Sequence, residues 1–311
     1  MKNFRNIIFV LIVLLFILQM LVMQKDKEKL SSKPIVAVST FSLYDITKHI
    51  AGESVEIVNI LPFGVDAHSF EPTPKLMSAL EKSVLVVYSG AGLEPWTKGF
   101  NFKSKVIDMS KNVMLRELDE NEHNLHDHHD SQCAHSSVDP HYWLDVKNMK
   151  IATELITKEL IKITPSQEKV YKKNRDEYIK ALIDLDEEYK ESLGSCRHDT
   201  IITNHNAFSY LATRYSFHIE ALSGLSPDTE PSAKEIRRVM KQIKKEDVSV
   251  IFFESFVSDR VMKSIAKDLS VRVDVLQPLG NITADEAKKN LTYEDIMRNN
   301  LLKLHKALEC R

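Results

Sequence analysis

Residues 165–194 read PSQEKVYKKNRDEYIKALIDLDEEYKESLG, and this stretch decides the fold. Thr164 and Pro165 resemble a helix cap followed by a first-turn proline, and Gly194 is well placed to end the helix. A helix over Gln167–Leu193 would have about 27 residues and span roughly 40 Å. That length exceeds a usual globular helix, so we expect a backbone that joins two domains. The alternative is one helix lying along a single large sheet.

On both sides of this stretch, strand-like and helical patterns alternate, as is typical of α/β proteins. The expected strands are Ile35–Thr40, Val55–Leu61, Val84–Ser89, Lys105–Met109, Asp199–Thr203, Phe217–Leu222, Val248–Glu254 and Val271–Leu276. The expected helices include Tyr44–Ala51, Pro74–Lys82, Lys234–Lys245, Asp259–Asp268 and Tyr293–Leu308. The pattern predicts two four-strand lobes, at 34–165 and 195–311, with a linking helix at 166–194.

Composition narrows the possible functions. The chain has 311 residues, 43% of them hydrophobic, which is enough to fill real cores. The net charge is −2, from 42 basic and 44 acidic residues, so no basic footprint for nucleic acid is present. With 8 glycines and no Gly-rich phosphate loop of Walker or Rossmann spacing, nucleotide chemistry is not expected either.

The N-terminus carries an apolar segment. Lys2 and Arg5 precede the run Ile7–Met23, whose only polar residue is Gln19. This length lies between a secretory signal and a membrane-spanning helix. No A-x-A cleavage site follows, and no cysteine at its end could accept a lipid. We interpret residues 1–30 as an export signal, or as a signal anchor retained in the membrane, in preference to a buried core helix.

Three isolated histidines stand in separate loops of the predicted lobes. His68 lies in DAHSFEPTP, His141 in VDPHYWLD and His205 in TNHNAFSYL. At least two of them follow expected strands, and ligands of open α/β sheets gather outside the carboxyl ends of strands. Imidazole suits zinc, copper, iron and nickel. The sequence therefore predicts a transition-metal site, although any single histidine could have an ordinary hydrogen-bonding role.

A histidine-rich tract, EHNLHDHHDSQCAH at residues 122–135, lies inside a hydrophilic segment at 118–137 that we expect to be a disordered loop. It could raise the local metal concentration as an accessory site, or be a dispensable solvated loop. Its histidines are His123, His126, His128, His129 and His135. One possible cysteine pairing joins Cys196 to Cys310 and leaves Cys133 free within the tract.

Several motifs together resemble a known family. They are VDAHSFEPTP at 65–74, SGAGLEPW at 89–96, DPHYWLD at 139–145, TNHNAFSYLATRY at 203–215, GLSPDTEPS at 224–232, and VIFFES with LQPLGNIT near 250–283. Over Ile35–Leu308 the chain is similar to the metal-binding receptors of bacterial ABC importers for zinc and manganese, the cluster A-I (cluster 9) family. The resemblance implies two α/β lobes, each a mainly parallel sheet with flanking helices, joined by one rigid helix with metal bound between them.

Carried over by motif, the ligands of that family fall on His68, His141 and His205. Many members add an acidic ligand after a proline-leucine pair, where this chain has Gly280. The fourth position is then water, Glu254 or Asp274. The histidine-rich loop is typical of the zinc-specific branch, and the three imidazoles favour Zn²⁺ over manganese, which prefers oxygen-rich shells.

The expected function is that of a periplasmic receptor which captures Zn²⁺ and delivers it to the membrane permease of a zinc ABC importer. We expect a monomer without enzymatic activity. One alternative is a manganese or iron receptor, or an adhesin, on the same fold. Another is a zinc-dependent hydrolase, for which Glu71 or Glu254 could be nominated as the general base.

Overall fold

The computed structural model describes residues 19, 33–117, 138–226, 231–256 and 259–311. The segment Ile35–Arg311 forms one compact unit and Met1–Pro34 a second. Within the described ranges, no helix combines the length and apolar character needed to cross a membrane. The predicted signal segment, apart from Gln19, and the whole histidine tract with Cys133 lie outside those ranges, so these predictions remain predictions.

The first sheet is fully parallel and has the strand order β2-β1-β3-β4. Its central strands are rich in Val and Ile and almost completely buried, as expected for a parallel sheet covered on both faces. The strands are β1 (Ile35–Val38), β2 (Glu56–Asn59), β3 (Leu85–Tyr88) and β4 (Lys105–Asp108).

The second sheet repeats this plan with the parallel order β10-β9-β7-β8. Its strands are β7 (Thr200–Thr203), β8 (His218–Ala221), β9 (Val250–Phe253) and β10 (Arg272–Val275). A short antiparallel pair, β5 (Arg116–Glu117) with β6 (Val138–Asp139), forms a third sheet. Two parallel four-stranded sheets confirm the predicted α/β fold class.

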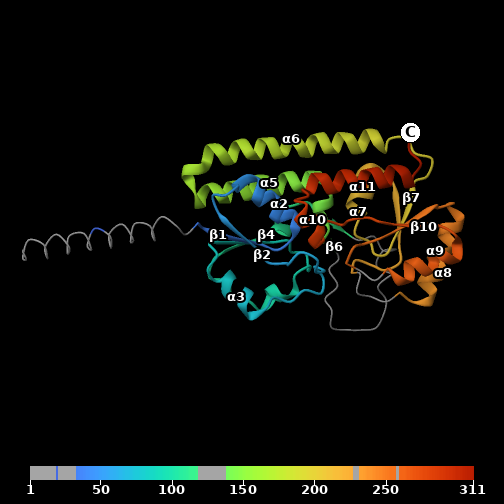
Figure 1. The fold of residues 1–311 in the computed structure, drawn as a ribbon, viewed down its shortest axis with the longest axis horizontal. Coiled ribbons are helices and arrows are strands. Elements are labelled where there is room, and N and C mark those ends of the chain that lie inside the picture. Colours follow the sequence, from blue (N-terminus) through green and yellow to red (C-terminus); the bar gives the residue numbers. More distant parts are fainter. Residues whose placement is uncertain (1–18, 20–32, 118–137, 227–230, 257–258) are drawn as a thin grey trace, which may run out of the picture. The chain divides into compact units, whose positions relative to one another are not determined.

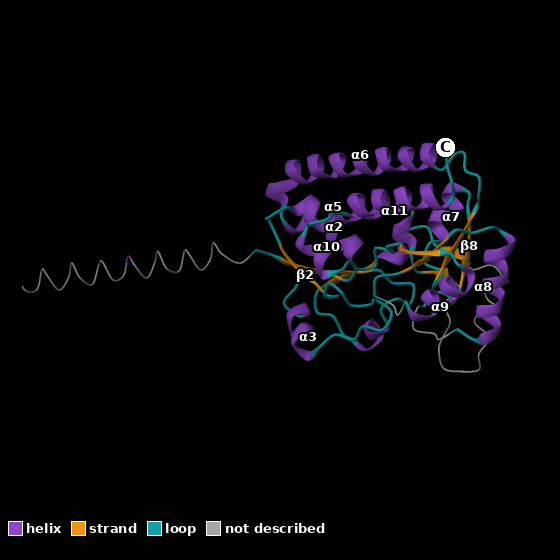
Figure 2. Cartoon of the chain, turned by 45° about the vertical axis from the view of Figure 1, so that its right-hand side comes forward, coloured by secondary structure: helices purple, strands orange, loops and turns teal. Residues whose placement is uncertain are grey.

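Long helices connect the two halves (Figures 1 and 2). Helix α5 (Val146–Ile163) and helix α6 (Glu168–Ser192) pack against each other and are separated by a 3₁₀ turn at Pro165–Gln167, directly after the cap predicted at Thr164. Helix α2 (Phe41–Ala51) and helix α11 (Tyr293–Ala307) pack against α6 from the first and second halves. The remaining helices are α3 (Pro74–Leu80), α7 (Ser209–Tyr215), α8 (Ala233–Lys245), α9 (Arg260–Leu269) and α10 (Ala284–Lys288).

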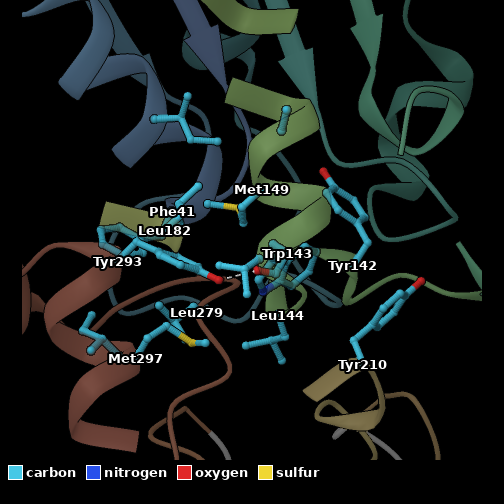
Figure 3. Packing of buried hydrophobic residues seen from close by; sticks show 14 of the residues in the cluster. Phe41, Tyr142, Trp143, Leu144, Met149, Leu182, Tyr210, Leu279, Tyr293 and Met297 are labelled. Carbon is cyan, nitrogen blue, oxygen red and sulfur yellow. Dashed lines mark hydrogen bonds between the residues drawn. The ribbon is translucent and has the colours of Figure 1, made fainter. Parts of the chain in front are cut away.

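One hydrophobic cluster runs through both halves. It includes Val36 of β1, Tyr171 of α6 and Phe252 of β9, together with residues of α2, α5, α7 and α11. Figure 3 shows its centre, where Trp143 lies near Tyr293 and Leu279. Smaller clusters cover the outer faces, one beneath α3 and one beneath α8 and α9. Side chains of the helical layer therefore belong to one hydrophobic core that both sheets share.

The disulfide Cys196–Cys310 is present, which confirms the pairing considered from the sequence. It joins the segment after α6 to the C-terminus, and main-chain hydrogen bonds from His198 N to Leu308 O (3.0 Å) and from Arg311 N to Ser195 O (3.0 Å) flank it.

Candidate metal site

The three predicted histidines converge. One nitrogen from each of His68, His141 and His205 lies within 4.8 Å of the other two. The ring centroids are 5.3 to 5.8 Å apart, and the rings are tilted or edge-on to one another. Tetrahedral zinc with Zn–N bonds of about 2.0–2.1 Å needs nitrogens about 3.3 Å apart. Small side-chain movements would suffice to reach that spacing.

His68 lies on the loop that follows β2, and the second half of the chain holds this loop. Asn281 donates two hydrogen bonds from its side-chain amide, to Pro62 O and Val65 O, both 2.7 Å long. The amide of Gly64 donates to Ile282 O at 2.9 Å. Within the loop, the amide of His68 donates to the Asp66 carboxylate at 2.8 Å. The position of His68 thus depends on a segment more than 200 residues away.

His141 follows β6 and is fixed by Asp139. One carboxylate oxygen, Oδ1, lies 2.8 Å from His141 Nδ1 and accepts the His141 amide at 2.9 Å. We assign the ring proton to Nδ1, since the carboxylate is an acceptor, and this leaves the Nε2 lone pair free for a metal. Both residues are essentially inaccessible to solvent.

His205 follows β7 and is held through its main chain. Its carbonyl accepts the hydroxyl of Thr203 at 2.8 Å, and the next amide, Asn206 N, donates to Gly224 O at 2.8 Å. Glu254, which follows β9, touches His205 Nδ1 with its Oε1, but without the angles of a hydrogen bond. Among the described residues, neither ring nitrogen of His205 has a hydrogen-bond partner. A buried imidazole in this condition is suited to binding a ligand.

Burial favours the neutral form of two of the three histidines, His68 and His205. It lowers the pKa of His68 well below the usual value, and the neighbouring rings of His141 and His205 lower it further. Burial lowers the pKa of His205 to about 3, with a contribution from His141 in the same direction. Burial also raises the pKa of Glu254 well above that of an ordinary carboxyl. His68 and His205 therefore offer neutral nitrogen lone pairs at pH 7, the form that ligates metals.

Trp143 forms a wall of the site. Its ring lies edge-on to His141, with centroids 5.4 Å apart, and its indole N–H donates to Pro278 O at 2.7 Å. The hydroxyl of Tyr293 donates to the Trp143 carbonyl at 2.7 Å, the bond drawn in Figure 3. A Cβ at Gly280 would lie 3.2 Å from the Trp143 ring. Gly280 thus leaves room for the indole.

The two acids considered for the fourth position differ in their surroundings. Glu254 is 3% exposed and contacts His205. Asp274 lies on β10 with its side chain about half exposed, 3.5 Å from Lys303 of α11. In the part of the chain that the structure describes, the three histidines are the one group of potential ligands close enough to share a metal ion.

Three residues that support the site were not identified from the sequence as functional. Asp139, Asn281 and Ser209 make contacts over long sequence separations with segments that carry the candidate histidines. Only Asp139 gives a sequence signal, since an acid two residues before a candidate ligand histidine can orient the ring. Asn281 lies in the quoted motif LQPLGNIT, but no pattern links it to His68.

Comparison with known proteins supports the resemblance. The family model described as "ZnuA: Zinc-uptake complex component A periplasmic" matches residues 36–307. The chain is 31% identical over 271 residues to the high-affinity zinc uptake system protein ZnuA of Bacillus subtilis, which covers 86% of this chain and 85% of that protein.

A second relative is longer than this chain. The zinc-binding lipoprotein AdcA of Streptococcus pneumoniae is 30% identical over 287 residues, which cover 90% of this chain but 57% of AdcA. The crystal structure of the Zn(II)-bound ZnuA-like domain of that AdcA superposes with a TM-score of 0.73 at 28% identity, covering 89% of this chain and all of the domain.

Proposed function

The chain belongs to the ZnuA family of periplasmic zinc-uptake components, and we propose that it binds Zn²⁺ through His68, His141 and His205. The observation that carries this proposal is the convergence of three histidines from three separate segments, with ligand nitrogens within 4.8 Å of one another. Two of the rings are buried and the third, His68, keeps part of its surface open. The lobes at 34–165 and 195–311, linked by 166–194, would each contribute to this site.

The donor set favours zinc over manganese. Three neutral imidazoles form most of a tetrahedral shell, the geometry that zinc adopts in proteins. Manganese prefers oxygen-rich shells, which three nitrogen donors do not supply. A manganese or iron receptor remains the alternative within the family, and competition between Zn²⁺ and Mn²⁺ separates the two proposals. Equal affinities for both metals would contradict the zinc assignment.

For the fourth position we propose Glu254 or a water molecule. Glu254 supports this because it is buried beside His205, and a bound cation would favour its charged form. Asp274 is a weaker candidate because it faces Lys303. Gly280 offers no side-chain donor atom, and the nearby Trp143 ring limits the space for a larger side chain.

The family supports a role outside catalysis. We propose that the protein is an exported monomer that passes Zn²⁺ to the permease of an ABC importer and does not bind nucleic acid. The export signal or retained anchor at residues 1–30 would keep it on the outer side of the cytoplasmic membrane. The tract at 122–135 would act as an accessory metal-capturing segment. A hydrolase would need a base beside an open coordination position. Glu71 is exposed on the surface, whereas Glu254 lies beside His205, so an activity assay has to separate the two functions.

Zinc titration by competition with a chromophoric chelator tests the site, with elemental analysis of the purified protein. Substitutions of residues that only support metal ligands lower metal affinity roughly 10–100-fold. We expect His68→Ala, His141→Ala and His205→Ala each to lower zinc affinity by more than that. His218→Ala is the control, because the His218 side chain is 77% exposed at the surface. A deletion of residues 122–135 should keep the tight site.

Two outcomes would contradict the proposal. Zinc binding of wild-type strength in the His141→Ala protein would show that the three histidines are not the site. Esterase or hydratase turnover by the zinc-loaded protein, abolished by the same substitution, would favour the hydrolase instead.

A further inference from the structure

Asp139 connects His141 to the second half of the chain. Its Oδ1 accepts two hydrogen bonds from His141, and its other oxygen, Oδ2, accepts the hydroxyl of Ser209. Asp139, His141 and Ser209 are 0%, 2% and 4% exposed. The carboxylate is therefore fixed from both sides inside the protein, away from competing water.

Ser209 belongs to the segment that carries another proposed ligand. It is the first residue of α7 and lies four residues after His205. The next residue, Tyr210, donates its hydroxyl to Asp139 O at 2.9 Å and accepts the Arg116 amide at 2.7 Å. The first turn of α7 thus holds the β5–β6 pair directly before His141. One buried carboxylate thus connects His141 to the segment that carries His205.

The hydroxyl of Ser209 determines how Asp139 can act. A carboxylate with one oxygen bound only to His141 could rotate about its Cβ–Cγ bond, and the ring of His141 would follow. A buried oxygen without a donor also costs about 1–3 kcal/mol. With Ser209 in place, both oxygens are satisfied and the plane of the group is fixed. His141 then presents Nε2 in one orientation.

We propose that Ser209 is a positioning residue for zinc, acting on His141 through Asp139 and so making a ligand that precedes α5 dependent on the placement of α7. This inference rests on the proposed function of His141. If α7 moves away from β6, Asp139 is released and His141 loses its orientation while all three ligands are still present. Displacement of the segment from His205 to α7 is thereby a route to zinc release.

The test compares Ser209→Ala with a matched control, Ser42→Ala. Ser42 is likewise a buried serine in the first turn of a helix, α2, where it bonds to Thr40 at 3.1 Å. Zinc affinity is measured by chelator competition, and zinc dissociation by stopped flow with excess chelator. The visible spectrum of the Co²⁺-substituted protein reports ligand geometry, and urea unfolding of the zinc-free protein reports stability.

We expect Ser209→Ala to weaken zinc binding about 10-fold, to speed dissociation and to change the Co²⁺ spectrum. Ser42→Ala should change affinity less than about threefold and leave the spectrum as in wild type, even if both variants lose similar stability. In an Asp139→Asn background the Ser209 change should add little, because its effect passes through that carboxylate.

Other outcomes overturn the inference. Wild-type zinc affinity in Ser209→Ala, an equal loss in Ser42→Ala, or full additivity with Asp139→Asn would each exclude the positioning role. His141→Ala measured alongside separates the two proposals. If His141→Ala loses zinc while Ser209→Ala does not, only this inference fails, whereas wild-type binding by His141→Ala means that the proposed site is wrong.

Discussion

Gly280 illustrates how a single residue acts through its neighbours. The Trp143 indole is 1% exposed and fixed by its hydrogen bond to Pro278 O, so it cannot easily move. Any side chain at position 280 would approach that ring at 3.2 Å, closer than most carbon contacts allow. Where many members of the family have an acid, this chain has a glycine with the Trp143 ring packed closely against it.

Glu94 is a second buried acid, outside the group of three histidines, and it gives a prediction about pH. It accepts hydrogen bonds from the Ser39 hydroxyl (2.6 Å) and from the amides of Ser89 (2.9 Å) and Gly90 (2.8 Å). Burial nevertheless raises its pKa to about 7. The hydrogen bonds lower the pKa by smaller amounts, and the charge of Asp108 raises it slightly. Because the pKa is raised on folding, the proton stabilises the folded state below pH 4.5, and this stabilisation is lost as pH rises to about 7.

We expect the zinc-free wild type to lose roughly 3 kcal/mol relative to Glu94→Gln between pH 4.5 and 7. Glutamine does not titrate in this range. Any packing defect of the variant therefore changes its free energy of unfolding equally at every pH and does not affect the pH dependence of the difference. Urea unfolding of both proteins at several pH values, with a chelator present, measures the difference. Parallel stability curves across this range would refute the raised pKa.

At the level of residues, the sequence singles out the proposed ligands more readily than the residues that support them. His68, His141 and His205 stand in loops with recognisable motifs, and the structure brings them together. Ser209 and Asn281 act across separations of 70 residues and more than 200 residues. Such contacts exist only once the chain is folded, so no local pattern reveals them.

Among elements, regular strands and long helices are predictable and short ones are not. All eight strands of the parallel sheets lie within the ranges expected from their apolar runs, and α6 lies within the predicted helix Gln167–Leu193. The seven-residue helix α7 and the two-residue strands β5 and β6 were not predicted. Their stability comes from tertiary contacts such as Tyr210 with Asp139, which outweigh weak local propensity.

The disulfide covalently links the segments that follow two long helices, α6 and α11. Cys196 follows α6 and Cys310 follows α11, at a sequence separation of 114. Replacing both by serine should lower the free energy of unfolding by roughly 2–5 kcal/mol, because the unfolded chain gains freedom. Zinc affinity should stay unchanged, since neither cysteine belongs to the proposed site. Urea unfolding and zinc titration measure the two effects, with Cys133→Ser as the control. Equal midpoints for wild type and the double variant would contradict the prediction.

For the whole molecule, the shared hydrophobic core limits how far the two halves can move relative to each other. The sequence predicts two halves and a linking helix, but it cannot show that one hydrophobic cluster extends from β1 to β9. Helix α6 is fastened to both halves by its side chains. The hydroxyl of Tyr178 donates to Asp45 of α2 at 2.8 Å, and that of Tyr189 donates to Met297 O of α11 at 2.7 Å.

Ion pairs add to this fastening along the same helix. Arg214 of α7 binds Asp186 through two nitrogens, at 2.6 and 2.7 Å, and both side chains are largely buried. Arg298 of α11 binds Glu188 in the same two-pronged way, with both contacts at 2.8 Å. A rotation of one sheet against the other would have to break such contacts and expose core side chains.

We therefore expect zinc to enter and leave through loop movement rather than through rotation of the halves. Spin labels at the exposed positions Ser78 and Lys267, in a Cys133→Ser background that keeps the native disulfide, report the distance between the halves. Pulsed electron resonance should give mean distances that differ by less than about 2 Å between zinc-free and zinc-bound protein. A larger shift would mean that the shared core yields on metal release, and that the helical layer acts as a hinge.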